Sequence, residues 1–311
     1  MIKSSSHLPS TITILGPTAS GKTRRAVQLA HAFGGEIVSC DSRQVYKGMD
    51  IGTGKDIEEY AEIPVHMIDV CPAGERYNLH RFLTDARCAL EDIRKRGQRI
   101  ILCGGSGMYL ENLIAGISLP EVPVDDELRK TLANKTLEEL TDILKTYKRL
   151  HNTTDVDTLQ RAVRAIEIAK WYESHPEEAE LADRRKVSPI DTILIGIDIP
   201  REKRREKIDT RLKQRLEEGM IDEVKCLLAD GVTHETLVYY GLEYKFLSFY
   251  LQGQLSYDEM VDGLLIAIHQ FAKRQMTWFR GMERRGTSIK WVHYLIDTEE
   301  LIDKTRQWLA G

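Results

Sequence analysis

Short runs of apolar residues recur along the chain. The first, at residues 11–15, is rich in β-branched side chains and leads into a glycine-rich segment. Such short, nearly continuous apolar runs are typical of strands that are buried on both faces, as in a parallel sheet. The sequence therefore predicts buried strands at residues 11–15, 36–40, 65–69, 99–103 and 192–197.

Segments with helical periodicity lie between these runs. Residues 22–33 form one such segment, and residues 78–96 form another, which Gly97 closes at a position that favours glycine. Strands that alternate with helices indicate a doubly wound parallel sheet with helices on both faces. We therefore predict an α/β fold with a parallel sheet core.

The pattern changes after residue 118. Pro120 and Pro123 interrupt the chain, and the stretch up to residue 186 is rich in Glu, Lys and Leu without a strand-like run. Beyond the fifth strand, residues 201–230 and 237–281 again have apolar positions at helical spacing. The predicted organisation is a catalytic core at residues 1–118 and 187–235, a helical insertion at 119–186 and a helical C-terminal region at 236–311.

Composition narrows the class of protein. A chain of 311 residues, 42% hydrophobic and 30% charged, is too balanced for disorder and too long for one compact α/β unit. The net charge of −4 argues against general binding of nucleic acid, although a local basic patch could still recognise one. The five cysteines form no C-x-x-C pair, so no zinc knuckle or disulfide framework is indicated. Since no uncharged run approaches the roughly 18 residues of a membrane helix, we expect a cytoplasmic protein without membrane contact.

The glycine-rich segment after the first strand matches the complete P-loop pattern, G-x-x-x-x-G-K-[ST]. In this pattern backbone N–H groups converge on phosphate oxygens at the start of a helix. Lys22 adds a positive charge, and the Thr23 hydroxyl is placed to bind Mg2+. The predicted phosphate-binding residues are Gly16, Pro17, Thr18, Ala19, Ser20, Gly21, Lys22 and Thr23.

Polar residues follow the second strand, beginning at Asp41. Because the carboxyl ends of neighbouring parallel strands share one crevice, Asp41 is expected beside the P-loop. With Ser42, Arg43 and Gln44 it offers a group of side chains that suits an acceptor substrate. The alternative, that Asp41 only caps the following turn, remains open. Ser106 lies in a second glycine-rich turn on the same edge, where glycines could serve a steric purpose alone.

Basic residues gather in two C-terminal segments. Lys207, Arg211 and Arg215 recur at four-residue spacing and so share one helical stripe. The second segment interleaves cations with aromatic side chains, a combination that suits unpaired RNA bases and their phosphates. A solvated helix face with core aromatics is the alternative. This second cluster comprises Phe271, Lys273, Arg274, Trp278, Phe279, Arg280, Arg284, Arg285, Lys290 and Trp291.

Four segments together resemble the tRNA dimethylallyltransferases, also called tRNA isopentenyltransferases. They are residues 16–23, 41–55, 104–109 and 272–280, and their order and spacing span nearly the whole chain. The resemblance implies transfer of a dimethylallyl group from dimethylallyl diphosphate to tRNA. The acceptor is N6 of the adenosine 3′-adjacent to the anticodon, at position 37. In this family the P-loop binds diphosphate rather than ATP.

The resemblance also implies roles for individual residues. Asp41 stands at the position of the general base that accepts the N6 proton. Lys22, the P-loop amides, Arg211 and Mg2+ at Thr23 would stabilise the charge of the leaving diphosphate. Arg211 lies eight residues before Gly219, as in the corresponding helix of the family. A structural salt bridge is the competing interpretation of Arg211.

The predicted tRNA contacts come from the resemblance and from the basic C-terminal cluster. Ser42 and Gln44 would read the edge of the adenine once it has left its stack. The chain departs from the family pattern at Glu243, where a glycine is usual, and at residues 151–155. The complete set is Asp41, Ser42, Arg43, Gln44, Ser106, Arg129, Gln160, Arg161, Ala162, Val163, Arg164, Lys273, Arg274 and Arg280.

Two other functions fit part of the sequence. A small-molecule P-loop kinase would bind ATP through Lys22 and Thr23, with Asp41 accepting a hydroxyl proton, but it has no need for Trp278 and its basic neighbours. An RNA-binding protein that is non-catalytic or hydrolyses ATP would use the basic helices alone. The expected partners are the tRNA anticodon stem-loop and dimethylallyl diphosphate, the expected cofactor is Mg2+, and the expected oligomeric state is a monomer.

Overall fold

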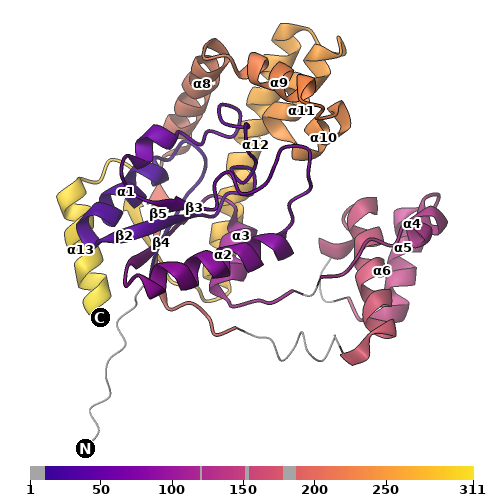
Figure 1. Cartoon of the computed structure of the whole chain (residues 1–311), viewed down its shortest axis with the longest axis horizontal. Coiled ribbons are helices and arrows are strands. Elements are labelled where there is room, and N and C mark those ends of the chain that lie inside the picture. Colours follow the sequence, from indigo (N-terminus) through magenta and orange to yellow (C-terminus); the bar gives the residue numbers. More distant parts are fainter. Residues whose placement is uncertain (1–10, 120, 151–153, 178–186) are drawn as a thin grey trace, which may run out of the picture. The chain divides into compact units, whose positions relative to one another are not determined.

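The computed structural model describes residues 11–119, 121–150, 154–177 and 187–311. These residues divide into two compact units, one of which combines the chain up to Ala115 with Pro189–Gly311. In its described residues this larger unit has one sheet of six parallel strands (Figure 1), in the order β3-β2-β4-β1-β5-β6. The strands are β1 (Thr11–Leu15), β2 (Gly35–Ser39), β3 (Val65–His66), β4 (Arg99–Gly104), β5 (Thr192–Asp198) and β6 (Ile289–His293). The predicted α/β class is therefore confirmed.

The predicted strands agree with the structure to within one residue at each end, except for β3. β1 begins and ends as predicted, but β3 stops at His66 rather than continuing to residue 69. Met67 and Asp69 have positive φ angles of 67° and 55°. This left-handed conformation interrupts an extended backbone. The strand therefore ends early, although residues 67–69 belong to the predicted strand.

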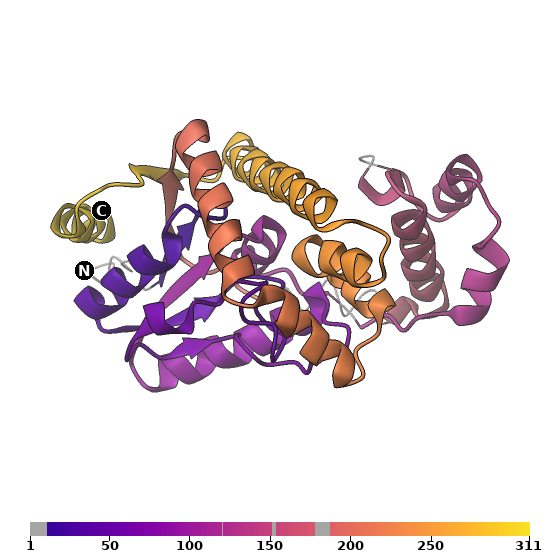
Figure 2. The same ribbon diagram turned by 90° about the horizontal axis from the view of Figure 1, so that it is seen from above.

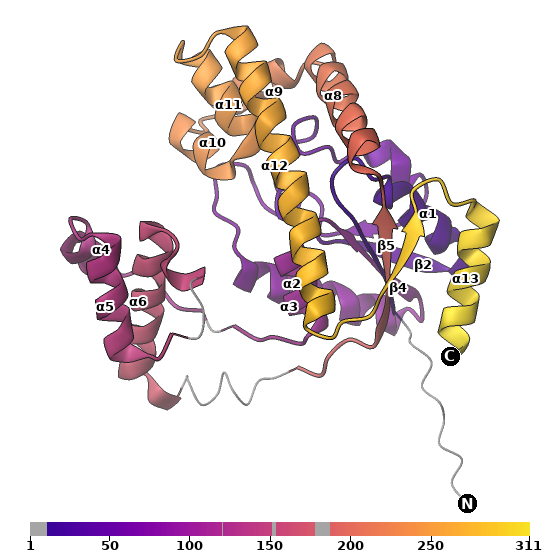
Figure 3. The same ribbon diagram turned by 180° about the vertical axis from the view of Figure 1, so that it is seen from behind.

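Helices cover the sheet and extend beyond it. Seen from above, α8 lies beside α12, and the two helices are in contact (Figure 2). Seen from behind, α12 packs against α11 and α3 (Figure 3). The helices of this unit are α1 (Lys22–Phe33), the 3-10 helix η1 (Ile57–Tyr60), α2 (Leu79–Lys95), α3 (Gly107–Ile114), α8 (Arg201–Glu217), α9 (Met220–Ala229), α10 (His234–Tyr240), α11 (Leu242–Leu251), α12 (Tyr257–Arg284) and α13 (Thr298–Ala310).

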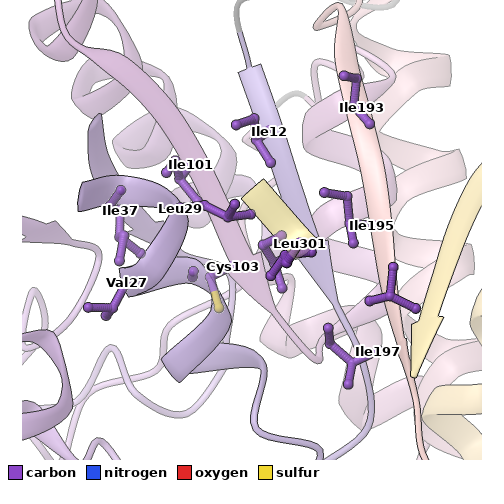
Figure 4. Close-up of a cluster of buried hydrophobic side chains, with 14 of the residues drawn as sticks. Ile12, Val27, Leu29, Ile37, Ile101, Cys103, Ile193, Ile195, Ile197 and Leu301 are labelled. Atoms are coloured by element: carbon purple, nitrogen blue, oxygen red, sulfur yellow. The ribbon is translucent and has the colours of Figure 1, made fainter. Parts of the chain in front are cut away.

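The core between the sheet, α1 and α13 explains the apolar runs. Alternate residues of the strands point toward α1, so that Ile12, Ile101 and Ile195 pack with Leu29 of α1 and Leu301 of α13 (Figure 4). All five side chains are completely buried. Burial of this kind stabilises the fold by roughly 25 cal/mol for each Å² of apolar surface. It also fixes the carboxyl end of β1, and with it the P-loop.

The C-terminal region differs from its prediction. Residues 236–311 are not only helical, because β6 adds a parallel strand to the sheet beside β5 and α13 then returns to pack on α1. β6 is an edge strand, in which only Ile289 and Val292 are buried. It therefore lacks the continuous apolar run by which the other strands were recognised. Trp291 covers Gly196 of β5, where an added Cβ would lie 2.4 Å from the indole ring.

The second unit, Gly116–Ser188, is built from helices in its described residues. It contains α4 (Asp126–Leu132), α5 (Leu137–Tyr147), the 3-10 helix η2 (Thr154–Val156) and α6 (Leu159–Ser174). Leu140 and Leu144 of α5 pack with Ile166 of α6 in a core of its own. Of the predicted departure at residues 151–155, residues 151–153 lie outside the described part of the chain. Among the described residues, no helix is both long enough and apolar enough to cross a membrane.

Candidate functional site

The P-loop connects β1 to α1 with a backbone that presents its N–H groups. Gly21 caps α1 with φ 81°, a conformation that favours glycine, and Ala19 also has a positive φ of 60°. The first turn of α1 contains no acidic residue, and no side chain caps its N-terminus. The amide groups at this end, and the positive end of the helix dipole, are therefore available to an anion.

A cavity of about 450 Å³ opens in front of the P-loop. Residues from the start of α1, from one face of α8 and from the segment around η1 line this cavity. The positively charged lining residues are Lys22, Lys207, Arg211 and Arg215, and Asp56, Glu59, Glu206 and Glu218 also line the cavity. The helical stripe that the sequence predicts on α8 thus faces the P-loop.

Burial lowers the pKa values of two cations in this cavity. It lowers the pKa of Lys22, and the nearby Cys103 and Asp41 partly offset this shift. Burial, together with the neighbouring Arg215, lowers the pKa of Arg211 to about 10. Since burial penalises a charged group and a nearby like charge adds to this penalty, a bound anion is the natural counterpart of this site.

A second, smaller cavity of about 40 Å³ lies next to the first. Lys22, Thr23, Arg211 and Arg215 line both cavities. The further lining includes Thr18, Ser39, Asp41, Arg43, Gln44, Cys103, Gly104, Glu243, Phe271 and Gln275. The P-loop and the segment that begins at Asp41 therefore meet in one place, as the sequence predicts.

Asp41 contacts the following turn and also lines the smaller cavity. Its Oδ1 accepts a hydrogen bond of 3.0 Å from the Arg43 N–H, which is the turn-capping role. The same carboxylate lines the smaller cavity beside Lys22 and Thr23. Ser106 accepts a 3.0 Å hydrogen bond from the Ser42 N–H and so ties the Asp41 segment to the second glycine-rich turn.

Gln44 and Arg43 are held by the protein itself. Gln44 accepts a 2.9 Å hydrogen bond from the Ser39 hydroxyl and donates a 3.0 Å hydrogen bond to the Gly54 carbonyl. Arg43 forms an ion pair with Glu243 and lies 5.4 Å above the centre of the Phe271 ring. Both ends of the Gln44 amide thus have partners, and reading of a base by Gln44 would require their exchange.

The loop from residue 46 to residue 55 is fixed by two charged side chains that the sequence analysis did not single out, the half-buried Glu223 and the buried Lys55. Glu223 of α9 accepts hydrogen bonds from the N–H groups of Asp50, Ile51 and Gly52, at 2.7, 2.6 and 3.1 Å. Lys55 is buried, donates to the Tyr46 carbonyl at 2.7 Å and forms ion pairs with Asp50 and Asp69. Lys55 stands in a segment that carries the family resemblance, but sequence alone shows none of its partners.

Gln275 joins the P-loop to the second glycine-rich turn. Its Oε1 accepts a 2.8 Å hydrogen bond from the Thr18 N–H, and its Nε2 donates a 3.0 Å hydrogen bond to the Gly105 carbonyl. Gly105 leaves room for this amide, because a Cβ there would lie 2.4 Å from Nε2. Gln275 is buried on α12. Like Glu223 and Lys55, it supports the site but was not singled out from the sequence.

We predict that Gln275→Leu weakens the P-loop. The substitution leaves the Thr18 N–H and the Gly105 carbonyl without their partner, and a buried unpaired group costs about 1–3 kcal/mol. The free energy of unfolding, measured by urea denaturation, should fall by that amount. Gln270→Leu, at an exposed position of the same helix, is the control. Equal stability of the two variants would contradict a stabilising role of the Gln275 hydrogen bonds.

The basic cluster of α12 has exposed cations, whereas its aromatic side chains differ in burial, from the exposed Trp278 to the buried Phe279. Lys273, Arg274 and Arg280 are exposed, and none of them forms an ion pair with a residue that the structure describes. Phe279 is buried in the core, and the Trp278 indole donates a 2.9 Å hydrogen bond to Glu111. The predicted stacking of RNA bases on these aromatics is therefore not supported for Phe279, nor for Trp291, which covers the sheet.

In the second unit, two of the predicted tRNA-binding arginines hold the unit together. Glu167 is buried and binds Arg129 at 2.6 Å and Arg164 at 2.9 Å. Arg161 is exposed and forms an ion pair of 2.5 Å with Asp157, and Gln160 is exposed as well. Val163 is half-buried. The side chain of Ala162 is completely buried, so it packs inside the unit.

Comparison with known proteins assigns the chain to a family. The family described as IPP transferase matches residues 44–282, which is more than half of the chain. The chain belongs to the IPP transferase family. A second family, described as isopentenyl transferase, matches residues 9–63 and so covers the P-loop.

Individual IPP transferases are similar over nearly the full length. The chain is 55% identical over 302 residues to tRNA dimethylallyltransferase 1 of Parabacteroides distasonis, covering 96% of this chain and 97% of the relative. It is 54% identical over 293 residues to tRNA dimethylallyltransferase 1 of Porphyromonas gingivalis, covering 93% and 95%. The structure of a tRNA isopentenylpyrophosphate transferase from Bacillus halodurans has a TM-score of 0.69 at 30% identity, covering 97% and 95%. These matches do not favour the kinase alternative.

Within the IPP transferase framework, Glu243 has a visible structural role. The sequence marks it as a departure from the family's usual glycine, and the structure places its buried carboxylate against Arg43. It therefore balances a guanidinium that lines the smaller cavity. Without this partner, Arg43 would remain as an uncompensated buried charge.

Proposed function

We propose that this chain transfers a dimethylallyl group from dimethylallyl diphosphate to tRNA. The proposed acceptor is N6 of the adenosine 3′-adjacent to the anticodon, at position 37, and the second product is diphosphate. The observation that carries the proposal is that Lys22, Thr23, Arg211 and Arg215 line both cavities. A site of this kind holds an anionic leaving group and an acceptor next to each other, and the names of the relatives supply the chemistry.

The larger cavity would take the diphosphate of the donor. The amides at the start of α1, Lys22 and Arg211 supply positive charge where the leaving group gains negative charge, as in other preorganised sites. The Thr23 hydroxyl lines both cavities beside Lys22, and its oxygen lone pairs could bind a cation there. Since Mg2+ is usually held by few protein ligands together with phosphate oxygens, these residues fit it.

Mg2+ supplies charge neutralisation of the diphosphate when it is bound. Among the described residues no group of three or more His, Cys, Asp or Glu side chains could hold a metal ion. In this proposal Thr23 would hold the metal ion together with oxygens of the diphosphate and water.

Asp41 would act on the acceptor side of the site. As the bond between the allylic carbon and the diphosphate oxygen breaks, the N6 nitrogen forms a bond to that carbon and its proton passes to the Asp41 carboxylate. A well-placed general base contributes about 10²- to 10⁴-fold in rate. The hydrogen bond from the Arg43 N–H to Oδ1 fixes the orientation of the carboxylate.

Entry of the adenine would require side chains to move. A space of about 40 Å³ admits about three water molecules, which is less than a purine base needs. Arg43 and Phe271 lie against each other at this cavity, so their displacement would open it. The proposed RNA substrate is the anticodon stem-loop of tRNA. The proposed enzyme is a monomer that acts in the cytoplasm.

The proposal is tested by incubation of the protein with radiolabelled dimethylallyl diphosphate, Mg2+ and unmodified tRNA. Label should appear on tRNA, and digestion to nucleosides should recover it in N6-dimethylallyladenosine. [γ-³²P]ATP serves as the alternative donor, because transfer of its phosphate to a small molecule would indicate a kinase. Absence of label on tRNA under these conditions would refute the proposed function.

We predict that the exposed cations of α12 contribute to RNA binding. Neutralisation of Lys273, Arg274 and Arg280 together should weaken tRNA binding and reduce the slope of log K against log salt by about two to three, since each phosphate contact contributes about 0.7 to 0.9. The control neutralises three ion-paired cations, the exposed Lys225 and Arg306 and the half-buried Lys304. An unchanged slope in the α12 variant would return these residues to an ordinary solvated helix face.

A further inference from the structure

Asp56 lies between two arginines of α8 at the larger cavity. Its Oδ2 forms an ion pair with Arg211, and its Oδ1 lies 3.8 Å from Nη2 of Arg215. All three side chains line the cavity together with the P-loop. One carboxylate thus faces two guanidinium groups at the place where the donor diphosphate is proposed to bind.

Arg215 is incompletely satisfied in this arrangement. Its side chain is 12% exposed, and Nη2 is buried without a hydrogen-bond acceptor among the described residues. The oxygen of Asp56 at 3.8 Å is too far for a hydrogen bond. Burial lowers the pKa of Arg215, and the nearby Glu243 opposes this shift. A buried cationic donor without an acceptor is costly, so an additional anion would satisfy it.

The backbone of the Asp41–Lys55 segment is shaped around Arg215. Gly54 has a φ of 62°, and a Cβ at this position would lie 1.6 Å from Nη2 of Arg215. Any larger residue would have to displace the guanidinium and would also adopt a strained positive φ. Glycine at position 54 therefore gives this arginine room beside the cavity.

The carboxylate of Asp56 is not used by its own backbone. Asp56 precedes η1 with φ 43° and makes no side-chain capping hydrogen bond, although aspartate is well suited to capping. The side chain is 38% exposed, so water can replace the arginines when the carboxylate moves away. Its interaction with Arg211 and Arg215 is therefore exchangeable.

We propose that Asp56 holds the place of the diphosphate, and that binding of the donor exchanges Asp56 for diphosphate oxygens on Arg211 and Arg215. Arg215 is then a second guanidinium of the diphosphate site, beside Arg211. This inference rests on the proposed function, which puts the diphosphate in the larger cavity. It predicts that Asp56 competes with the donor rather than assisting it.

The test measures binding of inorganic diphosphate, with Mg2+, by isothermal titration calorimetry. Asp56→Asn keeps the shape of the side chain and tolerates a positive φ, but it removes the competing charge. Its Kd should be about fivefold to tenfold lower than that of the wild type, a range typical of one competing charged contact. Glu58→Gln is the matched control: it neutralises an exposed acid of η1 that does not line the cavity, and its Kd should change by less than about twofold.

A second pair of variants tests Arg215 directly. Arg215→Met should raise the Kd for diphosphate about 10- to 100-fold, as loss of a buried charge-assisted contact does. Lys213→Met removes an exposed charge from the same helix and should have little effect. If Asp56→Asn fails to fold, the Arg215 pair decides the question, with melting temperature as the readout of folding.

The outcomes separate this inference from the proposed function. Equal or weaker binding by a folded Asp56→Asn variant, or unchanged binding by Arg215→Met, would overturn the exchange while the wild type still bound diphosphate. Failure of the wild type to bind diphosphate would overturn the donor site itself. Tighter binding by Asp56→Asn together with weaker binding by Arg215→Met would support the exchange.

Discussion

Asp41→Asn is expected to lower kcat for prenyl transfer by about 10²- to 10⁴-fold, which is the contribution of a well-placed general base. The affinity for tRNA should change by less than about twofold, because the amide keeps the volume of the carboxylate. Asparagine also keeps an Oδ1 that can accept the hydrogen bond from the Arg43 N–H. Single-turnover transfer of labelled dimethylallyl, together with a tRNA filter-binding assay, measures both quantities.

Asp41→Ala provides the comparison that separates chemistry from local folding. It removes the base and the turn contact together, so it should lose the same activity and also some stability. Turnover near the wild-type rate in Asp41→Asn would eliminate Asp41 as the base. Asp41 would then be only a turn residue.

Lys22→Met should lower kcat/KM for dimethylallyl diphosphate by about 10²- to 10³-fold, as loss of a single preorganised donor does in other enzymes. Lys22 lines both cavities, and methionine fills a similar volume without the charge. Binding of tRNA alone should be nearly unaffected. Steady-state kinetics with the donor varied at saturating tRNA measure the effect.

The pH dependence of donor binding offers an independent check on Lys22. Because burial lowers its pKa, Lys22 loses its positive charge at a lower pH than an exposed lysine does. Diphosphate affinity should therefore decline on the alkaline side, and this decline should be smaller in Lys22→Met. Lys207→Met removes another lysine of the larger cavity and is the comparison. If the alkaline decline of diphosphate affinity were equal in the two variants, a special role for Lys22 would be contradicted.

The elements that follow from local sequence were predicted well. β1 and α1 begin and end where the apolar pattern places them. β6 could not be recognised, because an edge strand is buried at few positions and carries Lys290 and Trp291 among them. Residues 201–230 form two helices rather than one because Gly219 adopts φ 99° between them.

The sequence was sufficient to predict the P-loop and the position of Asp41 beside it. It was not sufficient to predict the side chains that hold these loops in place. The P-loop follows a fixed spacing, and Asp41 follows from the rule that parallel strands end at one crevice. Glu223 and Gln275 act through backbone groups that are distant in sequence, at Gly52 and Thr18. No local pattern encodes such contacts, because they arise only when α9 and α12 pack against the loops.

The two outer strands of the sheet have a consequence for behaviour in concentrated solution. The unpaired N–H and C=O groups of an outermost strand can recruit a strand from another molecule. β3 offers only two residues for such pairing, and β6 carries the exposed charge of Lys290. Short length and a lysine are both features that discourage intermolecular pairing, so this protein is expected to resist aggregation through its sheet.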